Sequence, residues 1–402
     1  MAEVDRTPIT VAGQRQGATH PLESLHPDET ASAPVQALYI HVPFCFHKCH
    51  YCDFYSLVDT RDRQGPFTDR LIAELAQIAR FAGPLTSIFV GGGTPTLLRP
   101  DLWRRILACL HEHYELADAE FTVECNPETA TPELLAVLAA GGVNRISIGA
   151  QSFNPAHLKT LERWHDPANV GRAIELARSA GISRQSVDLI CAIPGQTLDE
   201  WEADLTQAVM FGVEHLSCYA LTYEPNTAMT ARMERGQFEP ADEDLEADML
   251  QLTLDTLRAH GYDRYEVSNY ARPNAECRHN LAYWRQDQWL AAGPSASGHV
   301  AGWRWKNVPR LDSYLGAPGD RGLPPAIDVE APDARRAIAE RIMTGLRLRE
   351  GIDAASLPDK LHAEAHRQRD GGNLVIDGNR WRLTDQGMML ADGIAAELMS
   401  LL

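Results

Sequence analysis

The chain has 402 residues, 44% of them hydrophobic, which is enough to bury a sizeable core and to form two or three domains. Its formal net charge is −18, and this acidic balance argues against nucleic acid as a partner, because a phosphate backbone requires clustered Lys and Arg. No apolar run reaches the roughly 18 residues that cross a bilayer, and no signal pattern opens the chain. We expect a cytoplasmic protein without a transmembrane segment, with a disordered leader over residues 1–34.

Residues 35–240 alternate between short β-rich runs and amphipathic helical stretches. The expected strands are Ala37–Val42, Ser87–Val90, Glu120–Glu124, Asn144–Ile148, Ser186–Ile190 and His215–Leu221. The expected helices are Arg70–Phe81, Leu102–His113, Glu133–Ala140, Pro167–Ala180 and Leu198–Phe211. Repeated βα units of this length predict a parallel sheet with helices packed outside it. Six such units predict an α/β fold of the partial (β/α)6 barrel type.

The alternation stops after residue 240. Residues 241–325 form a connecting segment with one helix candidate, Asp242–His260, and a chemically unusual run, Cys277–Trp284. In the last module, residues 326–402, two β-rich runs flank Asp377-Gly378-Asn379, a sequence typical of a hairpin turn. Helices on both sides of this hairpin predict a small winged-helix-like domain.

The residues that stand out chemically follow the predicted strands. Cys45–Cys52 follow the first strand, Gly91–Pro95 the second and Cys125–Pro127 the third, while Gln151 follows the fourth and Asp188 ends the fifth. A parallel barrel carries its chemistry at the carboxyl ends of its strands. The sequence therefore predicts that these residues form one site.

Three of the eight cysteines have the spacing C-x3-C-x2-C, at Cys45, Cys49 and Cys52. A secreted disulfide scaffold would be smaller and richer in cysteine, so a metal centre is favoured. Thiolates suit iron–sulfur clusters or zinc. Three cysteines can hold three irons of a [4Fe–4S] cubane and leave the fourth iron open for the amino acid end of S-adenosylmethionine (SAM). Zinc stays open as an alternative, since His41, His47 or His50 would complete its four ligands.

Two further segments favour a ligand pocket. Three successive glycines, in Gly91–Pro95, let a ligand approach the backbone, whereas a tight turn alone needs only one. Glu124, at the end of the third strand, is suited to accept hydrogen bonds from ribose hydroxyls; helix capping or a salt bridge is the structural alternative.

The segment Tyr39–Phe54 resembles the cluster loop of the radical SAM superfamily, in its oxygen-independent coproporphyrinogen oxidase (HemN-like) branch. The resemblance extends over nearly the whole chain after residue 34 and implies a [4Fe–4S] cluster on the three cysteines. It also implies a set of SAM-binding residues: Tyr39, Tyr51, Gly92, Gly93, Thr94, Glu124, Gln151, Arg163 and Asp188. One departure is Cys191-Ala192, where family members usually carry Tyr-Gly, and we expect it to change the pocket locally.

Two features distinguish branches of this family. The oxidase subgroup has a further cysteine two positions after the third cluster cysteine, where this chain has Phe54. The run His279-Asn280-Leu281-Ala282-Tyr283-Trp284 resembles the His-Asn-x-x-Tyr-Trp signature of HemW-type haem chaperones. This resemblance implies a protein that binds haem as cargo and transfers it to acceptor haemoproteins. His279, Tyr283 and Trp284 are the candidate haem residues; Cys277 and His299 compete as iron ligands, and core packing is the structural alternative.

Two enzymatic alternatives stay open, namely an oxygen-independent coproporphyrinogen III oxidase and a HemN-like radical SAM methyltransferase or cyclopropanase. The catalytic residues of such an enzyme are unknown from the sequence. If SAM is cleaved, an electron donor is a further partner, and transient contact with membrane haemoproteins is compatible with a chaperone. For the C-terminal module, the acidic chain favours a lid or partner-docking role over DNA binding.

Overall fold

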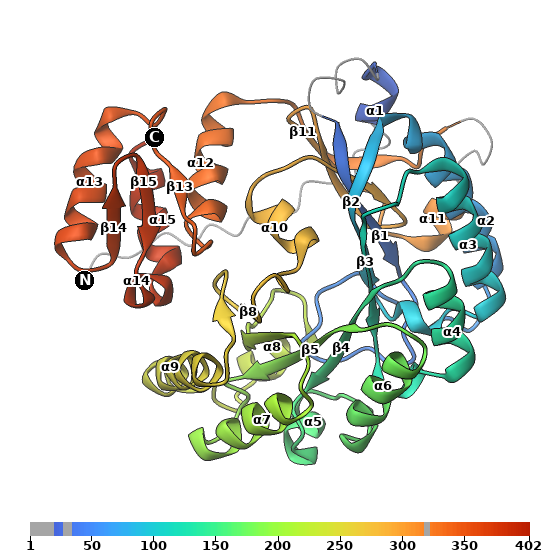
Figure 1. Ribbon diagram of the computed structural model, residues 1–402, viewed down its shortest axis with the longest axis horizontal. Helices are drawn as coiled ribbons and strands as arrows, with labels where there is room; N and C mark the ends of the chain where they lie inside the picture. Colours follow the sequence, from blue (N-terminus) through green and yellow to red (C-terminus); the bar gives the residue numbers. More distant parts are fainter. Residues whose placement is uncertain (1–19, 27–33, 317–321) are drawn as a thin grey trace.

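The computed structural model describes residues 20–26, 34–316 and 322–402, and its centre is a large mixed sheet (Figure 1). Six strands pair in parallel and in chain order, which confirms the predicted βα units. These strands are β1 (Val35–Val42), β2 (Ala82–Gly92), β3 (Glu120–Cys125), β4 (Arg145–Gln151), β5 (Arg184–Cys191) and β6 (His215–Ala220).

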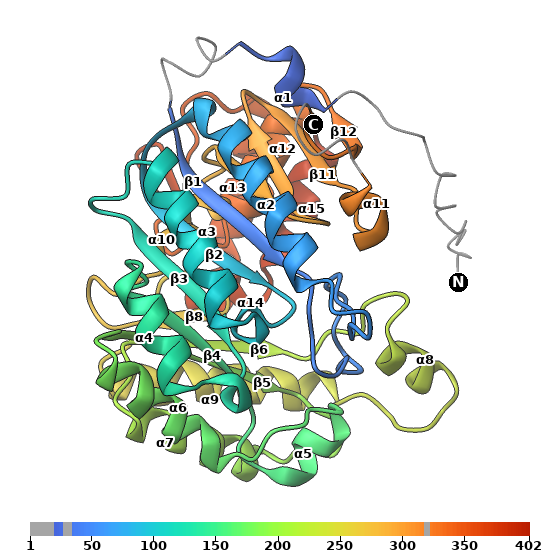
Figure 2. The same ribbon diagram turned by 90° about the vertical axis from the view of Figure 1, so that its right-hand side faces the viewer.

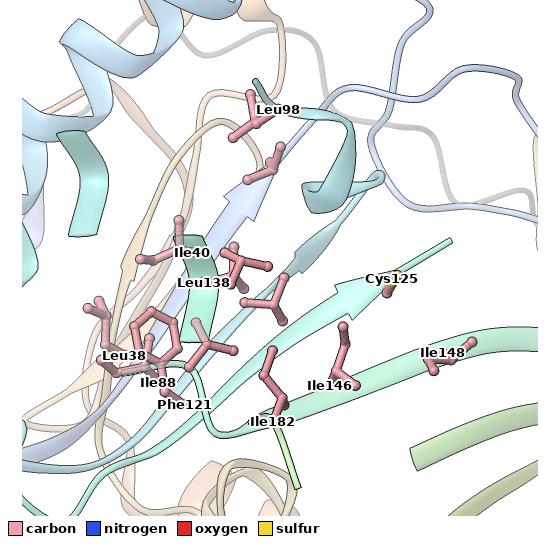
Figure 3. Packing of buried hydrophobic residues seen from close by; sticks show 14 of the residues in the cluster. Leu38, Ile40, Ile88, Leu98, Phe121, Cys125, Leu138, Ile146, Ile148 and Ile182 are labelled. Atoms are coloured by element: carbon pink, nitrogen blue, oxygen red, sulfur yellow. The ribbon is translucent and has the colours of Figure 1, made fainter. Parts of the chain in front are cut away.

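Five crossover helices connect successive parallel strands. They are α2 (Gln64–Ile78), α3 (Pro100–His113), α4 (Pro132–Ala140), α6 (Ala168–Ser179) and α7 (Leu198–Met210). Figure 2 shows α2, α3, α4 and α6 side by side over one face of the sheet. Alternate strand residues, such as Leu38, Ile88 and Ile146, form the buried core beneath them (Figure 3). The intervening residues, such as Glu124, Ser147 and Asp188, point to the opposite face, where the site lies.

The connecting segment extends the sheet at both edges, which the sequence pattern did not indicate. On one side, β9 (Trp289–Ala292) pairs in parallel with β1 and continues into antiparallel β10 (Ser297–Val300), β11 (Trp303–Asn307) and β12 (Ala326–Glu330). On the other side, β8 (Asn269–Ala271) and β7 (Asp263–Arg264) pair antiparallel after β6. Because β12 is bonded to β11, the large sheet continues past the predicted boundary at residue 326.

The helices that complete this part of the chain are the long α9 (Glu243–Ala259) and the short α5 (Pro155–Thr160), α8 (Ala228–Glu234), α10 (Arg278–Trp284) and α11 (Leu311–Leu315). The predicted leader falls mostly on residues 1–19 and 27–33, which lie outside the described residues. Between them, α1 (Pro21–Ser24) replaces the expected disorder, because Leu22 is fully buried and the His20 ring packs edge-on against Trp305 at 5.0 Å.

The C-terminal domain has its own core around Trp381. Its elements are α12 (Ala334–Gly345), β13 (Ile352–Asp353), α13 (Asp359–Asp370), β14 (Leu374–Asp377), β15 (Arg380–Leu383), α14 (Asp385–Met389) and α15 (Ala391–Ser400). The predicted hairpin is present as β14 and β15, and Gly378 takes the positive φ of 56° that its two-residue turn requires. β13 adds a third strand that the sequence pattern did not reveal.

Ion pairs link this domain to α9, to β7 and to the residue that follows α10. The Asp385 carboxylate accepts from Arg258 at 2.9 Å and from Arg264 at 2.8 Å, and Arg285 pairs with Glu350 at 2.8 Å. Polar interfaces of this kind allow domains to move relative to one another. Among the helices that the structure describes, none combines the length and apolar character needed to cross a membrane.

Candidate functional site

A cavity of about 1550 Å³ lies over the carboxyl ends of the parallel strands and extends to the C-terminal domain. One end is lined by the loop that follows β1, by the glycine segment at the end of β2, and by inward-facing side chains of β3, β4 and β5. The other end is lined by α9, by the β7–β8 edge and by the junction of α14 and α15. The predicted convergence of the strand-end residues is therefore present, and the C-terminal domain, for which the sequence favoured a lid or partner-docking role, contributes one wall.

Cys45, Cys49 and Cys52 line this cavity with partly exposed side chains, whereas the other five cysteines are buried. The Thr94 hydroxyl lies 3.7 Å from the Cys45 sulfur, and Arg163 lies 3.7 Å from that of Cys49. Burial raises the pKa of the Cys52 thiol to about 12, so the thiolate needs a cation beside it.

The three thiols fit the cluster. All three lie on one loop and are partly exposed to the same cavity. Three thiolates can hold three irons of a [4Fe–4S] cubane, since such a cluster spreads its thiolates over different irons.

At each of the three glycine positions, a different close contact leaves no room for a side chain. A Cβ on Gly91 would lie 2.8 Å from the Glu124 carboxyl carbon, and one on Gly93 would lie 2.7 Å from the Phe44 carbonyl oxygen. Gly92 has a φ of +105°, and a Cβ there would lie 2.5 Å from the His41 ring. The Gly93 amide also donates to the Val42 carbonyl at 2.7 Å. The segment therefore packs directly against the cluster loop and Glu124 while its backbone faces the cavity.

Two carboxyl groups lie within hydrogen-bonding reach of polar groups in the cavity wall. The Glu124 carboxylate accepts from the Gly92 amide at 3.1 Å, and Asp188 accepts from the Ser147 hydroxyl at 3.0 Å. Burial, with a smaller contribution from the negative charge of Asp188, raises the pKa of Glu124 to about 8. Asp188 does not end its strand as predicted, because β5 continues to Cys191; the side chain reaches the cavity from within the strand.

Two backbone positions near the pocket are strained. Gln151, the last residue of β4, has a φ of +66°, and Ala192, just after β5, has a φ of +58°. This left-handed conformation favours glycine. Ala192 stands where family members usually carry glycine, so the departure noted in the sequence adds local strain and leaves the strand register intact. Strained residues often cluster at binding sites.

The structure brings together most of the predicted SAM residues. Those lining the cavity with the three cysteines are Tyr51, Gly92, Gly93, Thr94, Glu124, Gln151, Arg163 and Asp188. Arg163 is held there by a 3.0 Å bond to the Gly149 carbonyl. Tyr39 is not among the described lining residues; its hydroxyl bonds to His41 at 3.1 Å inside the barrel. Ser147 and Tyr219 also line the cavity, although the sequence analysis did not predict them. Both alternate with apolar residues along their strands, and this alternation is the sequence pattern that could have identified them.

The candidate haem residues lie elsewhere. His279 is 1% exposed, and its Nδ1 lies 3.0 Å from the Ser87 hydroxyl on β2. Burial lowers the pKa of this imidazole to about 3. The Tyr283 ring packs between His279, at 4.7 Å, and Trp289, at 4.6 Å. In the described structure neither these residues nor Trp284, Cys277 and His299 line the cavity.

Six parallel βα units, a three-cysteine loop after the first strand and a strand-end cavity define a radical SAM protein. The family model for the radical SAM superfamily matches residues 39–208, and that for the HemN C-terminal domain matches residues 333–390.

Similarity to individual proteins shows to which family within this superfamily the chain belongs. "Heme chaperone HemW" of Mycobacterium tuberculosis is 37% identical over 369 residues, covering 90% of this chain and 94% of the relative. The protein of that name from Escherichia coli is 33% identical and covers 90% and 97%. The chain therefore belongs to the HemW family of radical SAM proteins. The solved coproporphyrinogen III oxidase (HemN) from E. coli has the same fold, with a TM-score of 0.79 at 22% identity over 94% of this chain and 93% of that one.

Proposed function

We propose that this chain is a haem chaperone that binds haem and transfers it to acceptor haemoproteins, using a [4Fe–4S] cluster and SAM. The observation that carries the proposal is its similarity, over nine-tenths of its length, to relatives that bear this name. The position of Phe54 supports it further. This ring is 60% exposed and lines the cavity where the oxidase subgroup has an additional cysteine.

Within this proposal, Cys45, Cys49 and Cys52 hold the cluster. If SAM is cleaved, the cluster would supply the electron that breaks a carbon–sulfur bond of the sulfonium, and an electron donor would then be a further partner. Arg163 balances the negative charge of the thiolates, beside which it lies. The backbone of Gly92–Thr94 borders the space for the amino acid end of SAM.

Other residues orient the rest of SAM. The carboxylates of Glu124 and Asp188 face the cavity, so they accept hydrogen bonds from hydroxyl groups. Gln151 offers both a donor and an acceptor from the end of β4, and Tyr51 lines the cavity from within the cluster loop. Transient contact with membrane haemoproteins, from the cytoplasm, is compatible with this function.

The experiment is anaerobic reconstitution with iron and sulfide, followed by haem titration with and without SAM. Wild-type protein is expected to gain cluster absorbance and to bind haem. Cys49→Ala is expected to lose the cluster, whereas the matched control Cys109→Ala, at a buried cysteine away from the cavity, keeps it. A cluster-loaded protein that binds no haem contradicts the proposal. Protoporphyrinogen formed from coproporphyrinogen III, or methyl transfer from labelled SAM, would identify an enzyme instead.

A further inference from the structure

A row of hydrogen-bonded side chains leads from the cavity into the interior of the barrel. It begins at Asp188, whose carboxylate lines the cavity. The Ser186 hydroxyl lies 3.4 Å from Oδ1 of Asp188 and 2.7 Å from Nδ1 of His215. Nε2 of His215 lies 2.9 Å from the Tyr265 hydroxyl, which lies 3.2 Å from Nδ2 of Asn280. This polar row therefore connects Asp188 to the His-Asn-x-x-Tyr-Trp run, to which Asn280 belongs.

The chemistry at its two ends sets the direction of the protons in the polar row. The Asn280 amide nitrogen only donates, and an ionised Asp188 only accepts. His215 is 1% exposed, and burial lowers its pKa well below the usual range, so its ring is neutral, with one donor and one acceptor. Every donor has an acceptor when Asn280 donates to Tyr265 and Tyr265 donates to Nε2 of His215. Nδ1 of His215 then donates to Ser186, whose hydroxyl is left to donate to Asp188.

Asp188 depends on such donors to accept hydrogen bonds from a ligand. Desolvation raises the pKa of its carboxyl group, which favours the protonated form. Hydrogen bonds and a nearby positive charge act against this rise, and they come from Ser217, Arg145, Ser147 and Ser186. A donor that turns away from Asp188 therefore makes the carboxylate less stable and less well oriented.

Tyr265 decides whether Ser186 donates to Asp188. In a neutral imidazole, the hydrogen bond at one nitrogen determines which nitrogen carries the proton. Because the Tyr265 hydroxyl donates to Nε2 of His215, the proton lies on Nδ1, and Ser186 accepts from it. Without this hydroxyl the proton moves to Nε2. Nδ1 then accepts from Ser186 and withdraws that hydroxyl from Asp188.

The inner end of the polar row is held by two parts of the fold. The Glu266 carboxylate accepts from the Asn280 amide nitrogen at 3.3 Å, so this nitrogen faces Tyr265 and Glu266 together. The Tyr265 carbonyl accepts from the amide of Arg349, which follows α12 in the C-terminal domain, at 2.9 Å. The position of Tyr265 is thus fixed where α10 and the C-terminal domain meet the barrel.

Resting on the proposed function, in which Asp188 binds SAM, we propose that Tyr265 is a positioning residue of the SAM site. Through His215 it turns the Ser186 hydroxyl toward Asp188. It thereby holds that carboxylate in the form and orientation that accept a hydrogen bond from SAM. Asn280 acts through Tyr265, so the His-Asn-x-x-Tyr-Trp run contributes to SAM binding from the interior of the barrel.

The test uses full-length, cluster-loaded protein and compares Tyr265→Phe with Tyr262→Phe. Each change removes one hydroxyl from a buried tyrosine, and Tyr262 is a matched control because its hydroxyl donates to the Val213 carbonyl at 2.6 Å, outside the polar row. The dissociation constant of SAM is measured by equilibrium dialysis. Tyr265→Phe is expected to raise it about three- to tenfold, because Asp188 loses one of several hydrogen bonds. Tyr262→Phe is expected to match the wild type, and both variants keep the cluster absorbance.

A double-mutant cycle separates positioning from a general loss of packing. Ser186→Ala breaks the polar row next to Asp188, so adding Tyr265→Phe to it is expected to weaken SAM binding no further. Losses that add in the double variant would overturn the proposal, as would a Tyr265→Phe protein with wild-type affinity for SAM.

The tautomer of His215 is a second readout, which does not depend on SAM. Nitrogen-15 chemical shifts of the ring, assigned by their absence from His215→Gln, are expected to show the proton on Nδ1 in the wild type and on Nε2 in Tyr265→Phe. A wild-type ring protonated at Nε2 would overturn the proposal. A wild type that has this Nδ1 proton but binds no SAM would instead refute the proposed function.

Discussion

Glu124 should make the stability of the ligand-free protein depend on pH. Its side chain is partly buried in the cavity wall, and desolvation, with a smaller contribution from the negative charge of Asp188, raises its pKa from the ordinary 4.5 to about 8. Between these values the unfolded chain has released a proton that the folded chain still holds. Because the unfolded state then binds fewer protons, the free energy of unfolding falls as the pH rises.

The magnitude follows from the same two values. At 1.36 kcal/mol for each pKa unit, the interval from 4.5 to about 8 corresponds to a loss of at most about 5 kcal/mol. Glu124→Gln removes this loss, since an amide oxygen still accepts from the Gly92 amide but does not titrate.

The assay is urea unfolding of cluster-free protein, wild type and Glu124→Gln, from pH 5 to pH 9. The wild type is expected to lose stability relative to the variant as the pH rises toward 8, and then to level off. Parallel curves for the two proteins would refute the account of Glu124 as a partly buried carboxyl that is protonated at neutral pH.

Three further changes test the site. Gly93→Ala forces a Cβ against backbone atoms of the cluster loop and is expected to lower unfolding stability by about 1–3 kcal/mol in urea, whereas the control Gly65→Ala, with nothing within 4 Å, is not. Ala192→Gly relieves a φ of +58° and is expected to raise the free energy of unfolding by about 0.5–1 kcal/mol, which a higher melting temperature would show. Asp385→Asn removes the ion pairs with Arg258 and Arg264 and is expected to lower the free energy of unfolding by no more than about 1 kcal/mol, because exposed ion pairs contribute little. A larger loss would contradict a solvent-exposed interface.

The parts of the fold that could be predicted from sequence are those with local periodicity. The six parallel strands and the β14–β15 hairpin have the alternation or turn residues that define them, and they are present. The cluster loop and the glycine segment were found because cysteine spacing and glycine runs are local signals.

What the sequence did not reveal depends on contacts between distant segments. The strands β9 to β11 lie in the predicted connecting segment and β12 in the predicted C-terminal module, yet together they complete one edge of the sheet. His279 is a candidate haem residue beside aromatic residues, and its burial against Ser87 depends on the packing of α10 on β2, which no local pattern shows. The end of the cavity lined by Met389 exists only where two domains meet, so no motif marks it.

Haem transfer tests the central claim most directly. Cluster-loaded protein carrying haem is mixed anaerobically with a haem-free acceptor haemoprotein, with and without SAM, and the acceptor spectrum is followed. The account predicts that the acceptor gains haem from the wild type, that SAM changes the extent or rate of transfer, and that Cys49→Ala transfers without any response to SAM. Haem that stays on the protein, or transfer that is identical with and without SAM, would contradict it.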